Sequence, residues 1–215
     1  MQIHNSLDQI YSEAQQCQAC PTIPPRKIYE NFGVKFPVAY YSKEEGGINA
    51  KIVFIMESPG IAKGGAAQTG NLESGGNYDL TAKNGAALRK HAGISLRDFF
   101  VTNSILHAGM TNDGKMRKPK NSEIKTCSSF VKRIIDVINP PIVAAVGNAA
   151  LKSLYFIEPH PCLKITECAG NHFKWYNRYA FPLCHWSPKG LISRSMKYQQ
   201  EDFKKLRELI DQIKK

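Results

Sequence analysis

Three residues that can do chemistry, an acid, an amide and an imidazole, stand at or near the ends of apolar runs. They are Glu57, Asn103 and His185. A carboxylate can activate a water molecule, an amide offers a donor and an acceptor on one group, and an imidazole can donate near neutral pH. Around one hole they would suit hydrolysis of a bond whose leaving group becomes negatively charged. Each also has a simpler interpretation, as a loop cap, a strand-end hydrogen bonder and a structural histidine.

The cysteines are a second set of candidate ligands. Cys17 and Cys20 form a Cys-x-x-Cys pair, a spacing typical of metal sites. The N-terminal segment is polar and does not look like a signal peptide, so we expect a cytoplasmic protein with reduced thiols. The remaining cysteines are Cys127, Cys162, Cys168 and Cys184. We interpret the last three as packing residues, because their spacing matches no known metal motif.

The composition is that of a globular protein with a basic bias. The 215 residues, 42% hydrophobic and 22% charged, are sized for one domain spanning 1–215, which we expect to act as a monomer. No apolar run is long enough to cross a bilayer, so we expect no membrane partner. The 29 Lys and Arg against 18 Asp and Glu give a net charge of +11, and several gather at 115–120. This excess favours a nucleic acid as partner, and a merely solvated basic surface stays open.

Apolar runs and capping residues alternate as strands and helices. Strands are predicted at 51–56, 99–105, 142–146 and 181–184, and helices at 3–16, 81–93, 121–138, 147–154 and 199–214. This alternation predicts an α/β fold, a three-layer α/β/α sandwich with a central, mostly parallel four-stranded sheet. The N-terminal helix and Cys-rich loop, residues 1–25, are expected to pack on it. Sites in such sheets lie at the carboxyl ends of the strands, where the three polar residues fall.

Four short motifs follow the predicted strands in order. They are Met56-Glu57-Ser58-Pro59-Gly60, Thr102-Asn103-Ser104-Ile105, Gly147-Asn148-Ala149-Ala150 and His185-Trp186-Ser187-Pro188. The ordered set resembles the uracil-DNA glycosylase superfamily, and most closely its iron–sulfur family 4, with the patterns Gly-Glu-Ala-Pro-Gly, Thr-Asn-Val-Val, Gly-x-x-Ala and His-Pro-Ser-Pro. The resemblance spans most of the chain. It implies a uracil-DNA glycosylase-like domain that binds DNA, flips out uracil or a related deaminated base, and excises it.

The resemblance implies a role for each polar residue. Glu57 would orient or activate water beside the sugar, and His185 would donate to uracil O2 as charge develops. Asn103 would read the N3–H and O4 edge of uracil, where cytosine presents the opposite pattern. Contacts to the base or the DNA would come from Ser58, Pro59, Gly60, Tyr78, Ser187, Lys189 and Leu191. Leu191 would fill the gap left by the flipped base, although it can equally be a core leucine.

The resemblance also implies a metal centre. Family 4 holds a 4Fe-4S cluster with four cysteines, and Cys17, Cys20 and Cys127 match three of them. His107 stands where the pattern asks for the fourth. Histidine can ligate iron–sulfur clusters, and a Cys₃His set is also common for zinc. A 4Fe-4S cluster, zinc and no metal therefore stay open, with the cluster favoured by the resemblance.

The sequence departs from the family pattern in three places. Met56 replaces a glycine, Trp186 replaces a proline, and the loop 61–78 lacks the acidic pair and the Pro-Phe segment of family 4. Tyr78 is the only ring in that loop. Two other functions therefore stay open. One is a nucleic-acid-binding protein with little or no catalysis and a structural metal, and the other is a hydrolase of free nucleotides or nucleosides.

Overall fold

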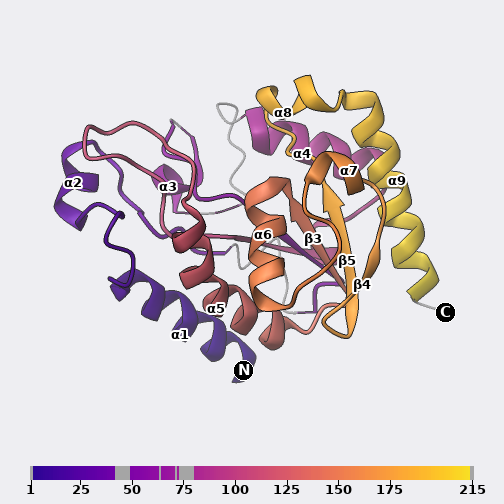
Figure 1. The fold of residues 1–215 in the computed structure, drawn as a ribbon, viewed down its shortest axis with the longest axis horizontal. Helices are drawn as coiled ribbons and strands as arrows, with labels where there is room; N and C mark the ends of the chain where they lie inside the picture. The colour runs from indigo at the N-terminus through magenta and orange to yellow at the C-terminus, as the bar shows by residue number, and fades with distance from the viewer. Residues whose placement is uncertain (1, 42–48, 63, 71, 73–79, 214–215) are drawn as a thin grey trace.

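A central β-sheet organises the residues that the computed structural model describes, namely 2–41, 49–62, 64–70, 72 and 80–213 (Figure 1). Its order is β2-β1-β3-β5-β4. β1, β2, β3 and β5 run parallel, and β4 pairs antiparallel with β5. The prediction of a mostly parallel α/β sheet is confirmed. The strands are β1 Ile52–Met56, β2 Phe99–Asn103, β3 Ile142–Val146, β4 Phe173–Trp175 and β5 Arg178–Leu183.

The sheet has five strands where four were predicted, because β4 adds an edge strand. β4 has three residues, of which only Trp175 is buried, so no apolar run marks it in the sequence. Tyr176 and Asn177 connect it to β5 with φ of 48° and 57°. Two consecutive residues with positive φ match the tight turn that suits the twist of a hairpin. The region 155–180, which had no clear pattern, therefore forms a hairpin at the sheet edge.

Helices cover both faces of the sheet and make three layers. Val53 and Ile55 of β1 pack in one core with α1, α5 and α6, while Ile52 and Phe54 pack in the other with α4 and α9. Successive strand side chains point to opposite faces, so one continuous apolar run supplies both cores. No helix in these described residues is long and apolar enough to span a membrane. The helices are α1 Gln2–Gln16, α2 Arg26–Asn31, α3 Ala66–Thr69, α4 Leu80–His91, α5 Asn121–Ile138, α6 Gly147–Ile157, α7 Ile165–Cys168, α8 Pro188–Ser193 and α9 Met196–Ile213, with a 3₁₀ turn at Leu96–Asp98.

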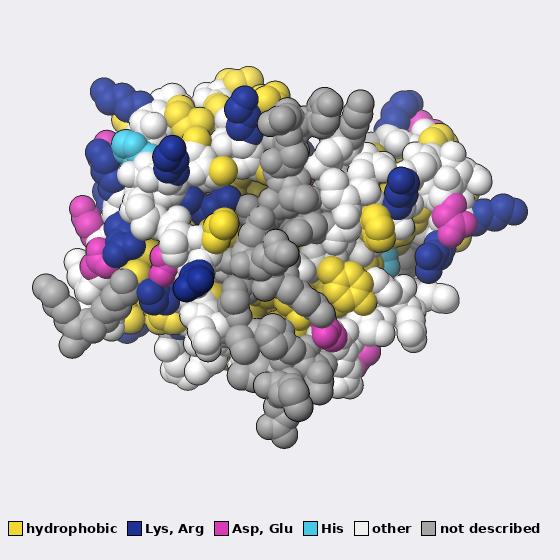
Figure 2. Space-filling model, turned by 180° about the vertical axis from the view of Figure 1, so that it is seen from behind, with side chains coloured by type: hydrophobic (Ala, Val, Ile, Leu, Met, Phe, Trp, Pro, Cys, Tyr) yellow, Lys and Arg dark blue, Asp and Glu magenta, His cyan; other side chains and the backbone are white. Residues whose placement is uncertain are grey.

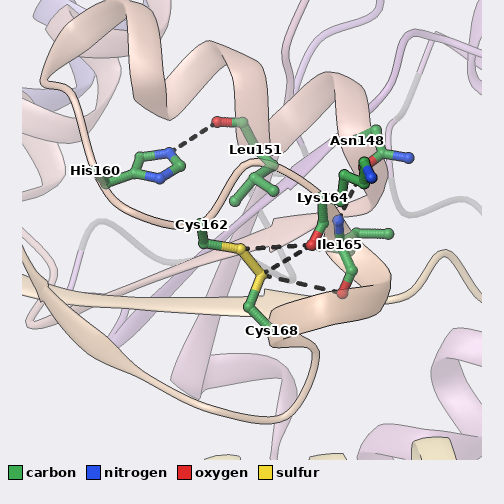
Figure 3. The surroundings of a disulfide bond; sticks show 7 residues. All are labelled: Asn148, Leu151, His160, Cys162, Lys164, Ile165 and Cys168. Atoms are coloured by element: carbon green, nitrogen blue, oxygen red, sulfur yellow. Dashed lines mark hydrogen bonds between the residues drawn. A yellow bond between two sulfur atoms is a disulfide. The ribbon is translucent and has the colours of Figure 1, made fainter.

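A disulfide joins Cys162 and Cys168 across the short helix α7 (Figure 3). The interpretation of both as simple packing residues is wrong. α7 folds the chain back so that their Cα atoms lie 6.2 Å apart, which is within the usual range for a disulfide. A separation of six residues without a recognisable helical pattern did not indicate this pairing. Cys184 is a buried free thiol, as expected of a packing residue.

Candidate functional site

The ends of three parallel strands meet at one cavity of about 820 Å³. Glu57 follows β1, Asn103 ends β2 and His185 lies two residues after β5, and all three line this cavity. β1 and β2 are neighbours in register, with Met56 opposite Asn103. The structure therefore brings together the acid, amide and imidazole that stand far apart in the sequence.

Asn103 carries an unused donor. The residue is 2% exposed, and its Nδ2 is buried without a hydrogen-bond partner among the described residues. The preceding residue, Thr102, shares a hydrogen bond of 3.0 Å with the hydroxyl of Tyr11 on α1, which fixes the end of β2 from behind. Leaving a buried N–H unpaired costs free energy, so this group is poised for a ligand that accepts a hydrogen bond.

His185 has a defined tautomer when it is neutral. Its Nδ1 accepts a hydrogen bond from the backbone N–H of Ser187 at 3.1 Å. A neutral imidazole whose Nδ1 accepts must carry its proton on Nε2. α8 begins directly against this residue, since a Cβ on Gly190 would lie 1.7 Å from the carbonyl oxygen of His185. Only glycine permits that approach.

Glu57 is half-buried between two cations. Burial raises the pKa of its carboxyl, while the nearby charges of Lys118 and Lys189 lower it. Its backbone carbonyl accepts the hydroxyl of Ser104 at 2.6 Å and the N–H of Ile105 at 3.3 Å. These bonds join the turn after β1 to the turn after β2. The backbone that carries the Glu57 carboxylate is therefore fixed relative to the backbone that carries the Asn103 amide.

Most of the other predicted contact residues line the same cavity, namely Ser58, Pro59, Gly60, Ser187 and Lys189. The Ser58 hydroxyl is buried without a partner among the described residues. Leu191 does not line the cavity and is half-buried in α8, whereas the next residue, Ile192, is 86% exposed. Tyr78 lies outside the described residues.

Two polar side chains of the cavity wall were missed from the sequence. Asn148 and Lys152 of α6 line the cavity, and Lys152 Nζ donates to Asn121 Oδ1, at the start of α5, at 2.9 Å. The side-chain Oδ1 of Asn148 accepts the backbone N–H of Ile165 at 2.9 Å and so joins α6 to α7, next to the disulfide (Figure 3). The Gly147 turn after β3 was the signal that α6 starts at the carboxyl edge of the sheet.

Trp186, which departs from the family pattern, is a core residue. It is buried and packs edge-on against Phe54 and Phe203. α4 approaches it through Gly85, where a Cβ would come within 2.6 Å of Trp186 Nε1. The indole thus packs in the core under this edge of the sheet, and Trp186 lines the cavity together with His185.

The four predicted metal ligands line a second, much smaller pocket of about 10 Å³. Cys17, Cys20, His107 and Cys127 all contribute to its wall, and the Leu106 N–H donates to Cys127 Sγ at 3.3 Å. Burial lowers the pKa of His107 to about 4 and raises the pKa of Cys127 to about 12. Among the described residues, no three such side chains are arranged closely enough to hold a metal ion. The donor set therefore fits a metal in kind and location, although the ligands do not form a coordination sphere in this structure.

A protein-family model described as the uracil DNA glycosylase superfamily matches residues 44–211. The chain belongs to the uracil-DNA glycosylase superfamily. This match covers the three residues of the cavity and confirms the family to which the motifs pointed.

Curated relatives of this superfamily member carry the name type-4 uracil-DNA glycosylase. The chain is 26% identical to one from Sulfurisphaera tokodaii over 209 residues, 95% of this chain and 85% of the relative. It is 26% identical to one from Saccharolobus solfataricus over 211 residues, 96% and 87% of the two chains. A relative from Thermotoga maritima is 28% identical over 131 residues, 61% of each chain. The first two alignments extend over Cys17 and Cys20, which the family model does not reach.

Proposed function

We propose that this protein removes uracil, or a related deaminated base, from DNA by hydrolysing its N-glycosidic bond. The observation that carries the proposal is the buried, unpaired Asn103 Nδ2 in a cavity that also exposes Glu57 and His185. A cavity of about 820 Å³ has room for an extruded nucleotide. Superfamily membership supports the same reaction class.

Asn103 reads the base in this proposal. Its Nδ2 donates to uracil O4, and its Oδ1 accepts the N3–H. Cytosine presents an amino donor and a bare ring nitrogen at these positions, so both hydrogen bonds would be lost and buried polar groups left unpaired. Selectivity for uracil over cytosine follows from this one amide, which β2 and the Tyr11–Thr102 bond hold in place.

His185 stabilises the departing base. As the C1′–N1 bond breaks, its electron pair moves onto the base and negative charge spreads to O2. The Nε2–H of neutral His185 donates to that oxygen, and the Ser187 N–H keeps the ring in this tautomer. No proton needs to move from His185 for the bond to break.

Glu57 acts on the other product of bond cleavage, the positively charged sugar. Its carboxylate stabilises that charge and orients a water whose oxygen bonds to C1′ while one water proton passes to the carboxylate and then to solvent. The neighbouring Lys118 and Lys189 oppose the effect of burial on its pKa and favour the ionised form. We propose that these two lysines, which line the cavity, contact the phosphates that flank the flipped nucleotide.

The positive net charge of the protein supports DNA as its partner. Figure 2, which views the molecule from behind, shows Lys and Arg side chains on both sides of the centre with fewer Asp and Glu among them, consistent with the net charge of +11. We propose that the first residues of α8 contact the backbone through Ser187 and Lys189. The apolar wedge belongs to the same helix, with Leu191 half-buried and Ile192 exposed enough to enter a base stack.

We further propose a 4Fe-4S cluster held by Cys17, Cys20, Cys127 and His107. When bound, it would supply a rigid cross-link between the N-terminal segment, the turn after β2 and α5. Burial favours the neutral thiol of Cys127 in the metal-free protein, and the Leu106 N–H donated to its Sγ would stabilise the thiolate once a metal is bound. Purified protein that is brown, absorbs near 400 nm and contains iron would support the cluster. Colourless protein with stoichiometric zinc would exclude it.

We also propose one domain spanning 1–215 that acts as a cytoplasmic monomer. The packing of α1 on α5 and the sheet core supports a single unit. In a reducing compartment the Cys162–Cys168 pair would be present as two thiols.

The test is release of abasic sites from single- and double-stranded oligonucleotides that contain uracil or hypoxanthine. Wild-type protein should produce alkali-labile sites. Asn103→Asp should slow uracil release about 10²–10³-fold, because its carboxylate cannot donate to O4, and it can admit cytosine. Asn177→Asp, in the β4–β5 turn, is the matched control and should keep the full rate.

An unchanged rate in Asn103→Asp would remove the base-reading assignment. Firm DNA binding without cleavage of any deaminated base would instead support a non-catalytic DNA-binding protein. Release of bases from free nucleosides without DNA binding would support a hydrolase of small substrates.

A further inference from the structure

The cavity and the cysteine pocket are joined by one buried ion pair. Arg117 lines the cavity, and its partner Glu123, in the first turn of α5, lines the cysteine pocket. Their side chains are 16% and 1% exposed. The loop that carries Arg117 runs from β2 to α5, so it passes from one site to the other along the surface.

Arg117 contacts three separate segments of the chain. Its Nη1 donates to Glu123 Oε2 at 2.9 Å. Its Nη2 donates to Glu123 Oε1 and, at 2.9 Å, to the backbone carbonyl of Thr22. Its Nε donates to the carbonyl of Met110 at 3.2 Å, and Nη1 reaches the carbonyl of Lys118 at 3.2 Å. All of the side-chain nitrogens are used, which a lysine could not reproduce.

Both carboxylate oxygens of Glu123 also have several hydrogen-bond partners. It accepts the backbone N–H of Lys120 at 2.7 Å and the hydroxyl of Thr22. The guanidinium of Arg117 and these donors hold the pKa of Glu123 at about 2 although burial opposes ionisation. A buried ion pair gives little net stability after desolvation, but it specifies one geometry, because either partner alone would be a buried unpaired charge.

The residue placed by this arrangement is Lys118. It follows Arg117 directly, its side chain is exposed at the cavity rim, and its charge acts on Glu57. The backbone before Lys118 is fixed by the Arg117 N–H on Gly109 O at 3.0 Å and by the pairing of Met116 with Met110, and the backbone after it by the Lys120 N–H on Glu123. The position of Lys118 therefore depends on the Arg117 fork and, through Thr22, on the Cys-rich segment.

We propose that Arg117 is a positioning residue that holds Lys118 against a DNA phosphate at the cavity rim and ties this rim to the Cys17–Cys20 segment. The proposal rests on the proposed function only in taking DNA as the partner. In this role the planar guanidinium of Arg117, which donates to several acceptors at once, matters more than its positive charge.

The experiment measures the salt dependence of binding to an undamaged duplex oligonucleotide. Lys118→Ala should reduce the slope of log affinity against log salt by about one, because one phosphate contact is lost. Arg117→Lys should give the same reduction although it keeps the net charge. The double variant should show no further loss. The matched control is Arg133→Lys. It alters another forked ion pair, between Arg133 and Glu13, in which the two side chains are 43% and 41% exposed.

A wild-type slope in Arg117→Lys, or full additivity in the double variant, would overturn the proposal. Glu123→Asp keeps both charges and replaces Arg117→Lys if that variant does not fold, with the same expected result.

Amide hydrogen exchange of the wild-type protein adds a test that needs neither DNA nor a variant. The N–H groups of Arg117 and Lys120 should be protected, and fast exchange at both would overturn the positioning role. Because undamaged DNA is used, binding that behaves as described without any uracil release would refute the proposed function and leave this inference standing.

Discussion

The two candidate sites differ in what holds their residues in place. The cavity of Glu57, Asn103 and His185 stands on the ends of β1, β2 and β5, and paired strands fix the backbone at each of these points. The cysteine pocket is built from the end of α1, the Cys-rich loop, the turn after β2 and α5. One is open and about 820 Å³ in volume, and the other encloses about 10 Å³.

This difference separates a site that the sheet preorganises from one that needs its ligand. In the cavity, the Asn103 Nδ2 donor is buried without a partner, so folding has already fixed its position and ligand binding loses no further conformational entropy there. In the pocket, four suitable ligands share one wall without forming a coordination sphere among the described residues. Metal binding would supply the missing order there, since metal affinity and local folding are coupled. Changes at the cavity should therefore affect rate, and changes at the pocket should affect stability.

The largest effect is expected at Glu57. Glu57→Gln keeps the size of the side chain and removes its charge, so uracil release should slow about 10²–10⁴-fold, the usual range for loss of a general base. Single-turnover release of abasic sites measures this step directly. The melting temperature should stay near that of the wild type, because the half-buried carboxylate costs free energy to desolvate.

Glu30→Gln is the control for Glu57, since Glu30 pairs with Arg26 on the exposed surface of α2. A rate within threefold of the wild type in Glu57→Gln would assign Glu57 to a structural role. It would also contradict the expectation that changes at the cavity affect the rate and changes at the cysteine pocket affect stability.

The next effect is expected at His185. His185→Ala removes the Nε2–H donor and should slow uracil release about 10²–10³-fold, as for loss of one donor to a developing anion. The slowing should be largest for uracil and smaller for a base whose departing anion is more stable. His172→Ala, which alters an exposed histidine that contacts Tyr179 edge-on, should keep the rate. Equal rates for His185→Ala and the wild type would mean that the imidazole does not face the base.

The cysteine pocket should respond in the opposite way. Cys17→Ser should abolish metal binding and lower the melting temperature by about 4–8 °C, corresponding to roughly 2 kcal/mol for a chain of this size. The single-turnover rate, measured at a temperature where the variant is folded, should change little. Metal analysis and calorimetry on the same samples give both quantities. Cys184→Ser is a poor control because Cys184 lines the cavity, so Cys168→Ser in the reduced protein is preferred.

A large loss of rate with an unchanged melting temperature in Cys17→Ser would contradict this division between the sites. It would mean that the metal acts on the reaction and not on the fold. The link from Thr22 through Glu123 to Arg117 is the route by which such an effect would reach the cavity.

The sequence predicted best what depends on long apolar runs and on strand order. Residues 52–56 and 142–146 are continuous apolar strands, and the rule that parallel strands end at one edge was enough to bring Glu57, Asn103 and His185 together. Family membership followed from motifs at those same ends. The roles of the individual residues remain predictions.

What the sequence did not reveal depends on short elements and on distant packing. β4 and α8 are too brief to carry a period, so neither the edge strand nor the exposure of Ile192 beside Leu191 was visible. The pairing of Cys162 with Cys168 requires α7 to fold back between them. The fit of Trp186 against Gly85 joins residues of different motifs, and a single sequence carries no signal for such a contact.

The smallest effect concerns the acid limb of the pH profile. Glu57 must be ionised to act, and its pKa is raised by burial, so the wild-type rate should fall as the pH drops through a value above the ordinary carboxyl range. Lys118 and Lys189 lower that pKa, so removing either charge should move the acid limb to higher pH, by less than about one unit because both are exposed to solvent. Single-turnover rates between about pH 4 and 8 for Lys118→Ala and Lys189→Ala measure the shift, with Lys174→Ala on β4 as control. A shift to lower pH would mean that the group titrating on the acid side is not Glu57, because loss of a neighbouring positive charge can only make a carboxylate harder to ionise.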